Sequence, residues 1–396
     1  MAFILIKQES CHARYIGGNL KLLIQPGDGV APLLDAINGA KSRVEIAIFR
    51  FDRREIEQAL ANAAARGVFV HALIAYTNRG GERNLRKLEM RLLEAGITVA
   101  RTADDLVRYH DKFLIIDRRE LYMLSFNFTQ LDIDRSRCFG LVTTDPKLVA
   151  EAVKLFEADT KRQPYVPGLS SFVVSPVNAR KELTAFIRGA KKQLLIYDPE
   201  ISDPAILRLL DSRAQADVEI KIIGRISQSS QKLVVRKLSF MRLHTRTIIR
   251  DGSAAFVGSQ SLREMELGSR REVGIIFRDK KIVSMLAKTF QDDWDAIERA
   301  AEQPAEREIA QPAAPQDDAA QLAKVAKRVA KAITKDLPPV APVLRVVVRE
   351  MVGESGHLDL ESAVIQESVQ DAVKEAVKEA VRDAVETAVE QNGSAQ

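Results

Sequence analysis

The stretch HDKFLIID at residues 110–117 returns 134 residues later as HTRTIIRD at residues 244–251. Each copy holds a histidine, a cation two positions on, and a carboxylate five positions further along. One such octapeptide can arise by chance, whereas a pair at matched spacing indicates two half-sites that are built to meet. These stretches therefore predict a duplicated unit in which both copies contribute to one site.

The duplication extends well beyond the octapeptides. The same offset relates further identical residues without a gap, over the length of a supersecondary unit. These pairs are Ser125 and Ser259, Gly140 and Gly274, Asp145 and Asp279, Lys147 and Lys281, Phe156 and Phe290, and Asp159 and Asp293. Upstream, apolar runs at 44–49 and 68–75 correspond in order to runs at 194–197 and 218–223. We interpret the pattern as two copies of one α/β unit packed around a pseudo-twofold axis.

Strands and helices alternate along both copies. The apolar runs 113–116 and 254–257 are typical of buried strands. Leu85, Leu88 and Leu92 form a helical stripe that Gly96 ends. Strands that alternate with helices favour an α/β fold, with helices covering mixed sheets.

Composition breaks divide the chain into four parts. We expect a first lobe at 1–163, a second lobe at 169–300, a Pro/Ala-rich linker at 301–319 and a mostly helical C-terminal tail at 320–396. Ala-Val pairs recur every four residues from 372 to 389, which predicts a helix with a small apolar stripe. Self-association through a helix at 361–390 is one reading, and a solvated helix without a partner is the other.

Cysteine and apolar content limit the class of protein. The 396 residues are 46% hydrophobic, enough for two sizeable cores. Cys11 and Cys138 are the two cysteines, which argues against a disulfide framework or a zinc site. No signal-peptide core and no membrane span is evident in the sequence, so a cytoplasmic location is expected. A peripheral location at a membrane stays open, because surface binding needs no span.

Charge is distributed unevenly along the chain. Residues 301–396 hold 11 basic and 17 acidic side chains, which gives this segment a net charge of −6. Residues 1–300 carry +11, and the two parts sum to the net charge of +5. A basic body fits phospholipid headgroups or nucleic acid, and an ordinary solvated surface is the alternative. Aromatic residues are only 6% of the chain, which disfavours a single-strand nucleic-acid groove lined by stacking rings.

The paired motif has the composition of a phosphoryl-transfer site. A neutral imidazole is a nucleophile near neutral pH, and a second imidazole can act as general acid. Lys112 and Arg246 can neutralise a phosphodiester, and in an extended segment they point the same way as His110 and His244. One histidine would attack phosphorus, and the resulting phosphohistidine would be opened by water or an alcohol. No metal and no other cofactor is expected.

These residues closely resemble the signature of the phospholipase D superfamily, including cardiolipin synthase-like proteins. The residues that match are His110, Lys112, Asp117, Ser125 and Asn127 in the first copy, and His244, Arg246, Asp251, Gly258 and Ser259 in the second. The resemblance covers residues 20 to 300 approximately and implies two α/β lobes with one active site at their interface. It implies a phosphohistidine intermediate, with Ser125, Asn127 and Ser259 binding the phosphate. We expect Asp117 and Asp251 to fix the turns that support the catalytic set rather than touch substrate.

Four departures from the signature bear on roles. Leu124 replaces the motif glycine, Arg246 replaces lysine, and Ser261 stands near the second asparagine position. Glu272 lies 28 residues after His244, where the family often places a carboxylate that orients the histidine. We therefore expect Glu272 to orient His244.

The position equivalent to Glu272 in the first copy is Cys138, so His110 lacks an orienting acid unless Asp132 or Asp134 substitutes. Which histidine is the nucleophile is left open. By the pairing alone His244 is better supported, although the resemblance more often gives that role to the first histidine.

The leading functional expectation is a phospholipase D-like phosphodiesterase or phosphatidyltransferase that acts on phospholipid at a membrane surface. A nuclease of the same superfamily is the second reading, favoured by the basic body. A catalytically weak or inactive scaffold that assembles through its tail is the third, because of the departures at Leu124, Cys138 and Arg246.

Overall fold

The computed structural model describes residues 20–76, 82–228 and 232–302. The expected C-terminal tail at 320–396, its 361–390 helix and all but the start of the expected linker lie outside these residues. Among the described helices, none is long and apolar enough to pass through a membrane.

The first lobe is an α/β unit built on a mixed sheet. Its strands are β1 (Leu20–Gln25), β2 (Arg43–Ile48), β3 (Phe69–Ile74), β4 (Thr98–Arg101), β5 (Arg108–Tyr109), β6 (Phe113–Ile116), β7 (Glu120–Leu124) and β8 (Ser136–Thr143). Its helices are α1 (Ala31–Gly39), α2 (Arg54–Ala65), α3 (Glu82–Glu94), α4 (Gln130–Arg135) and α5 (Pro146–Thr160). The sheet order is β1-β8-β7-β6-β2-β3-β4, with β2, β3 and β4 parallel and the others antiparallel.

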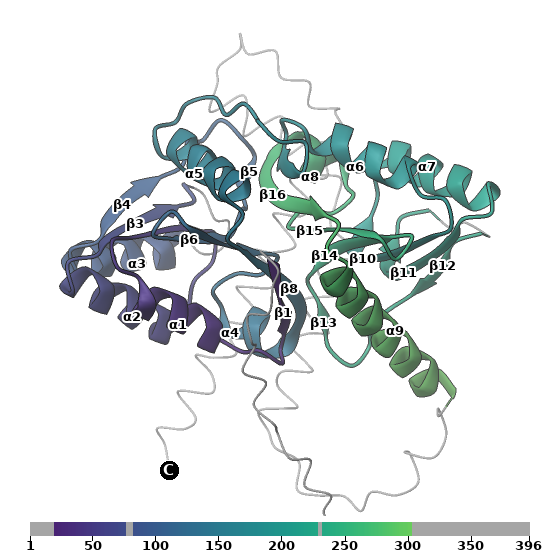
Figure 1. The fold of residues 1–396 in the computed structure, drawn as a ribbon, viewed down its shortest axis with the longest axis horizontal. Helices are drawn as coiled ribbons and strands as arrows, with labels where there is room; N and C mark the ends of the chain where they lie inside the picture. The colour runs from purple at the N-terminus through teal and green to yellow at the C-terminus, as the bar shows by residue number, and fades with distance from the viewer. Residues whose placement is uncertain (1–19, 77–81, 229–231, 303–396) are drawn as a thin grey trace, which may run out of the picture.

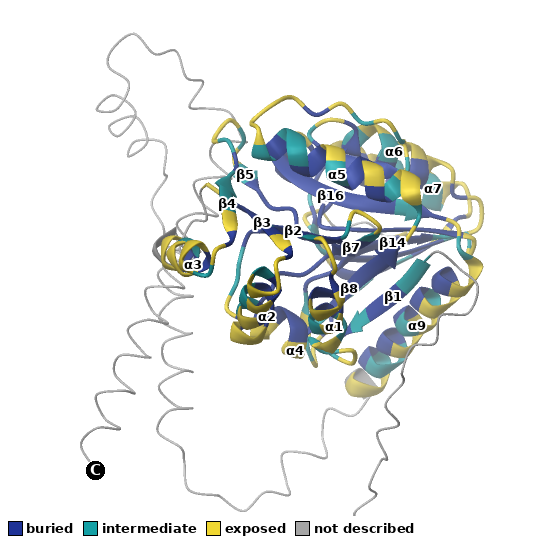
Figure 2. Cartoon of the chain, turned by 60° about the vertical axis from the view of Figure 1, so that its left-hand side comes forward, coloured by how far each residue is buried: buried dark blue, intermediate teal, exposed yellow. Residues whose placement is uncertain are grey.

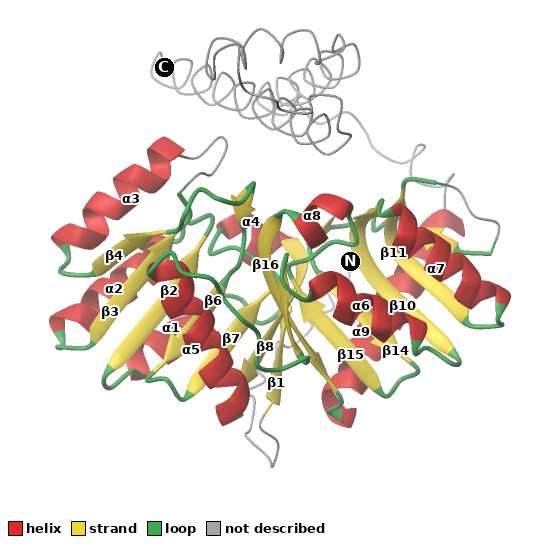
Figure 3. Cartoon of the chain, turned by 90° about the horizontal axis from the view of Figure 1, so that it is seen from above, coloured by secondary structure: helices red, strands yellow, loops and turns green. Residues whose placement is uncertain are grey.

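The second lobe repeats this plan, as Figure 1 shows, and in Figure 3 the strands of the two lobes lie side by side with helices over them. Its strands are β9 (Phe172–Ser175), β10 (Gln193–Ile201), β11 (Glu219–Ile226), β12 (Val234–Arg236), β13 (Arg242–Leu243), β14 (Arg246–Arg250), β15 (Ala254–Gly258) and β16 (Arg270–Phe277). Its helices are α6 (Ala179–Arg188), α7 (Pro204–Gln215), α8 (Glu264–Gly268) and α9 (Lys280–Glu302). The sheet order is β12-β11-β10-β14-β15-β16, and β9 pairs with β16 as β1 pairs with β8. The expected pair of α/β lobes with helices over mixed sheets is confirmed.

Local chemistry explains where the long helices begin. Asp145 caps α5 by accepting from the amides of Lys147 and Leu148, and Pro146 fits the first helical position. Its repeat partner Asp279 accepts from the Ile282 amide at the start of α9. The two aspartates, which are 134 residues apart, therefore mark the start of equivalent helices in the two lobes.

The two lobes share one central core. Inward-facing strand residues such as Phe139 of the first lobe and Tyr197 of the second belong to the same buried cluster, together with faces of α5 and α9. The Phe139 and Tyr197 rings meet edge to face with centroids 5.6 Å apart. Separate apolar clusters lie beneath α1, α2 and α3 and beneath α6 and α7, and Figure 2 shows the strands buried between these helical layers.

A strand exchange ties the lobes together. The short strand β13 of the second lobe pairs in parallel with β8 of the first, and β5 of the first lobe pairs in parallel with β16 of the second. Two ion pairs cross the same boundary, one partly buried and one buried. Arg137 of β8 binds Asp293 of α9 at 2.8 Å, and Arg271 of β16 binds Asp159 of α5 at 3.0 Å. Both the exchange and the ion pairs obey the pseudo-twofold relation.

Candidate active site

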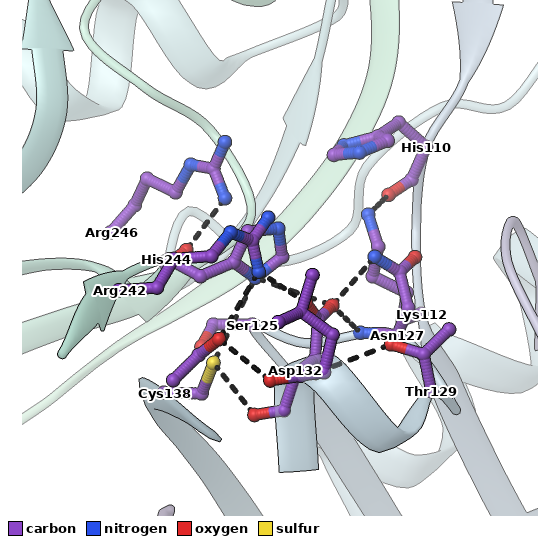
Figure 4. Close-up of polar contacts among 12 residues, drawn as sticks. His110, Lys112, Ser125, Asn127, Thr129, Asp132, Cys138, Arg242, His244 and Arg246 are labelled. Carbon is purple, nitrogen blue, oxygen red and sulfur yellow. Dashed lines mark hydrogen bonds and ion pairs between the residues drawn. The ribbon is translucent and has the colours of Figure 1, made fainter. Parts of the chain in front are cut away.

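The strand exchange carries each histidine to the boundary between the lobes. His110 follows β5 directly, and its amide donates to the Arg271 carbonyl at 2.8 Å. His244 follows β13, and its amide donates to the Arg137 carbonyl at 3.2 Å. Figure 4 shows the two rings in one site with Lys112 and Arg246 beside them, and each histidine is only 7% exposed. The histidines that lie far apart in sequence are thus brought together.

His110 is oriented by a carboxylate from the other lobe. Its Nδ1 lies 2.8 Å from Oε2 of Glu272, a fully buried residue of β16. The expectation that Glu272 orients His244 is therefore wrong, because β5 pairs with β16 and places His110 against the second lobe's acid. Glu272 does lie 28 residues after His244, but the acid at this spacing contacts the histidine of the other copy, His110.

His244 has a different environment. Its Nδ1 lies 3.5 Å from Oδ2 of Asp132 and 3.8 Å from the Cys138 thiol. The suggestion that Asp132 or Asp134 substitutes beside His110 is also wrong. Asp132 faces His244, and Asp134 pairs with Arg53 at 2.6 Å.

The two cations are held in matching ways. Lys112 Nζ donates to the carbonyl of His110, and Arg246 Nη1 donates to the carbonyl of His244 at 2.6 Å. The guanidinium of Arg246, which is wider than an ammonium group, also donates from Nε to Ser261 Oγ at 3.0 Å. Ser261 stands near the second asparagine position of the signature, and this contact holds the guanidinium there. Both cations are buried, so they are fixed in place before any anion binds.

Burial and neighbouring charges shift the protonation of this site. Burial, followed by Lys112 and Arg246, holds the pKa of His110 well below its usual range. Burial also lowers the pKa of His244 strongly, although Asp132 opposes the shift. It lowers the pKa of Lys112 to about 7 and, with the nearby Glu266, raises the pKa of Glu272 to about 8. Because burial disfavours the charged forms of His110, His244 and Lys112, a bound anion would stabilise these positive charges, and the site therefore suits an anionic ligand.

Asp117 and Asp251 lie away from the histidines, at the opposite ends of β6 and β14. Asp117 accepts from the backbone amides of residues 41, 42 and 43, and Asp251 accepts from those of residues 191, 192 and 193. Both have positive φ, 52° in each case. As expected, they fasten the loop after α1 or α6 to the end of the motif strand, so they support the catalytic set through the backbone.

The small polar residues of the motif mostly brace strands. Ser125 Oγ accepts from the Phe139 amide at 3.0 Å, and Ser259 Oγ accepts from the Val273 amide at 3.1 Å. Each hydroxyl thus binds the neighbouring strand, and phosphate binding by Ser125 and Ser259 stays a prediction. Asn127 donates from Nδ2 to Asp132 at 2.7 Å, and its buried Oδ1 has no hydrogen-bond partner among the residues that the structure describes. Phosphate binding by Asn127 stays a prediction.

Leu124, the departure from the motif glycine, has a packing explanation. It pairs across strands with Gly140, where an added Cβ would lie 2.9 Å from the leucine side chain. The equivalent pair in the second lobe is Gly258 and Gly274, whose Cα is 2.8 Å from a Cβ built at Gly258. The leucine thus fills the first lobe's core over a glycine partner.

Several site residues escaped the sequence analysis. Phe49 meets the His110 ring edge to face at 4.4 Å, and Lys112 Nζ lies 5.1 Å from its ring centre. Because Phe49 ends an apolar run, it was indistinguishable from core. Glu266 and Arg270 form a buried pair at 3.1 Å, and Arg242 binds Asp132 across the lobes. Asp132 and Glu266 are acids at equivalent positions of the two copies, 134 residues apart, and this repetition could have identified them as site residues.

Among the described residues, no group of three or more His, Cys, Asp or Glu side chains is arranged to hold a metal ion. The arrangement provides an oriented imidazole in His110, a second imidazole in His244 and two fixed cations. These are the parts needed to bind a phosphoryl group and transfer it through a histidine.

Comparisons with known proteins agree with this geometry. The family model described as cardiolipin synthase, PLD-like domain, matches residues 33–160 and 183–294. The mitochondrial cardiolipin hydrolase of Danio rerio is 30% identical over 130 residues, which make up 32% of this chain and 56% of that relative. This chain thus spans little more than half the length of that curated relative.

Solved structures share the fold. The polyphosphate kinase of Porphyromonas gingivalis matches with a TM-score of 0.59 and 21% identity, over 69% of this chain and 50% of its own. The phosphatidylserine synthase of Haemophilus influenzae Rd KW20 matches with a TM-score of 0.56 and 11% identity, over 70% and 86%. At these identities the likeness concerns architecture alone. Together with the family model, which covers both lobes, the crossed pair of histidine motifs places the chain in the phospholipase D superfamily, a group of enzymes that act on phosphodiesters.

Proposed function

We propose that this protein is a phospholipase D-type phosphodiesterase or phosphatidyltransferase that acts on phospholipids through a covalent phosphohistidine. The observation that carries the proposal is the contact between His110 and Glu272 across the lobes, with His244 and two buried cations in the same site. Two similar proteins, a cardiolipin hydrolase and a phosphatidylserine synthase, support lipid phosphodiesters as the substrate class.

His110 is the proposed nucleophile. Ionised Glu272 accepts the Nδ1 proton of His110, which leaves the Nε2 lone pair free to attack phosphorus. The N–P bond forms as the bond from phosphorus to the leaving oxygen breaks. His244, as imidazolium, gives its proton to that oxygen, and Lys112 with Arg246 neutralises the phosphoryl oxygens.

The second half of the reaction restores the enzyme. Water, or the hydroxyl of an acceptor alcohol, attacks phosphorus on the phosphohistidine and gives its proton to His244. The N–P bond then breaks and His110 regains its lone pair. Water as acceptor gives a phosphatidic acid, and an alcohol gives a new phosphodiester, so one site serves both hydrolase and transferase chemistry.

The test uses the full chain with labelled phosphatidylcholine, phosphatidylglycerol and single-stranded DNA, each with and without a chelator. Headgroup release that chelator leaves unchanged, together with a label trapped on one histidine, is the expected result. The trapped bond should be acid-labile and alkali-stable, and His110→Asn should abolish it. Label at neither position 110 nor 244 in an active preparation would refute the mechanism.

The nuclease reading has one specific support, the +11 charge carried by residues 1–300. Cleavage of the DNA, with no turnover of either lipid, would replace the lipid proposal with that reading while keeping the same histidine chemistry. Silence on all three substrates would favour the scaffold reading.

A further inference from the structure

The two half-sites are not equivalent, although the fold that carries them is duplicated. Glu272 orients His110, but the same strand position in the other half-site is Cys138, whose thiol is 3.8 Å from His244 Nδ1. That thiol also lies 3.5 Å from the carbonyl of Asp132, to which it can donate. A neutral thiol cannot supply the negative charge that a carboxylate gives to an imidazole.

A carboxylate nevertheless faces His244 from another element. Asp132 of α4 is buried, and its Oδ2 lies 3.5 Å from His244 Nδ1. The same oxygen accepts from the amide and the side chain of Asn127, at 2.8 and 2.7 Å. The other oxygen of Asp132 binds Arg242. Figure 4 shows these contacts converging on Asp132.

Through Arg242, Asp132 is also bound to the segment that carries His244. Arg242 precedes His244 by two residues, so the two side chains project to the same side of an extended segment. Arg242 also donates to Ser136 Oγ at 3.2 Å, next to the pairing of β13 with β8. Asp132 therefore holds both the strand that delivers His244 and one side of its ring.

We propose that Asp132, locked by Arg242, is the positioning residue of His244 and takes over the role of the acid that is absent at Cys138. The proposal rests on the proposed function, in which His244 is the general acid. The separation of 3.5 Å is long for a hydrogen bond, and such contacts tighten when a charged state forms during catalysis.

The charges around His244 define what Asp132 contributes. The groups that act on it are Asp132 of α4, Cys138 of β8, Lys112 of the first motif, Arg242 of β13 and Arg246 of β14. Asp132 is the anion among the four charged groups of this set, and it raises the pKa of His244 against burial and three cations. In return, His244 and then Arg242 hold the pKa of Asp132 well below its usual range, although burial alone would raise it. Asp132 thus favours the protonated imidazole that donates to the leaving oxygen.

The test compares two leaving groups in Asp132→Asn. Release of an alkoxide from phosphatidylcholine needs a proton from His244, whereas 4-nitrophenolate leaves bis(4-nitrophenyl) phosphate without one. Because His244 also accepts the proton of water in the second half of the reaction, the comparison uses kcat/KM, which reports only the steps up to formation of the phosphohistidine. We expect kcat/KM to fall about 100-fold on the lipid and less than about 3-fold on the nitrophenyl ester, within the range for general acid catalysis. The alkaline limb of the lipid pH profile should move to lower pH.

A rescue variant separates charge from architecture. Cys138→Glu in the Asp132→Asn background places an acid where Glu272 stands in the other half-site, and we expect it to restore at least a tenth of the lipid activity. Asp134→Asn is the matched control, because Asp134 lies on the same helix and pairs with Arg53. It should keep the wild-type ratio between the two substrates.

Equal loss on both substrates, without rescue, would overturn the positioning role and leave Asp132 as a brace for α4 and β13. The proposed function would survive that outcome, provided that His110→Asn still abolishes turnover of both substrates. If wild-type turnover does not depend on His110, the proposed function fails and the role of Asp132 fails with it.

Discussion

Oε2 of Glu272 lies 2.8 Å from Nδ1 of His110, although 162 residues and a lobe boundary separate the two. The reason is the pairing of β5 with β16, which directs the first histidine into the second lobe. Each motif histidine is faced by an acid of the other lobe, Glu272 for His110 and Asp132 for His244, so the site depends on the assembled pair.

Replacing Glu272 with glutamine tests this relationship. The amide can still contact Nδ1 but carries no charge, and loss of the orienting acid in a comparable triad costs up to about 10⁴ in kcat. Burial raises the pKa of Glu272 to about 8, and Nε2 of His110 is free only when that carboxyl is ionised. Wild-type kcat/KM should therefore rise with pH toward about 8, and Glu272→Gln should lack this acidic limb. A rising limb that persists in the variant would assign it to another group.

Lys112 should make anion binding to the empty site depend on pH. Burial lowers its pKa to about 7, so the empty site loses a positive charge as pH rises through that value. Sulfate, whose charge is constant in this range, should inhibit competitively with a Ki that weakens about tenfold per pH unit above about 7. In Lys112→Arg the Ki should stay flat, because arginine does not titrate there. A wild-type Ki that is independent of pH would show that Lys112 stays protonated.

The partly buried pair between Arg137 and Asp293 should stabilise the contact between the lobes. Asp293→Asn removes the charged partner of Arg137, which costs about 1.5–3 kcal/mol of unfolding free energy, the range for a hydrogen bond to a charged group. Asp292→Asn is the control, because its pair with Lys288 is exposed and contributes less than about 1 kcal/mol. Denaturant unfolding monitored by circular dichroism measures both. Equal effects from the two variants would contradict a locking role.

Asp117 should matter for stability rather than chemistry. Against the effect of partial burial, the backbone amides of Arg43, Lys41 and Ser42 lower its pKa to about 2. A carboxyl whose folded pKa is depressed stabilises the protein above its unfolded pKa and loses that contribution as pH falls toward the folded value. Asp117→Asn should therefore cost about 1–3 kcal/mol at pH 7 and progressively less between pH 4 and pH 2.

The activity of folded Asp117→Asn, per mole of folded protein, should remain close to that of the wild type. A loss of more than about 100-fold, the scale of removing a catalytic group, would show that Asp117 acts in the chemistry itself.

Sequence alone was sufficient for the architecture of both lobes. The offset of 134 that relates Phe156 to Phe290 and Asp145 to Asp279 predicted a duplication, because residues that begin helices or fill cores must recur where the backbone repeats. The two histidines and their cations could be named for the same reason. Their types and spacing follow from chemistry and from the alternation of side chains along a strand.

Tertiary structure decided which acid serves which histidine. Sequence spacing suggested that Glu272 belongs with His244, since both lie in the second copy, yet the exchange of β5 and β13 assigns Glu272 to His110 and Asp132 to His244. Likewise only the structure shows that the hydroxyls of Ser125 and Ser259 accept from backbone amides of the neighbouring strands. Pairing between lobes is a contact between segments far apart in the chain. Two-residue strands such as β5 carry no periodic signal of their own, so only the packed molecule determines their partners.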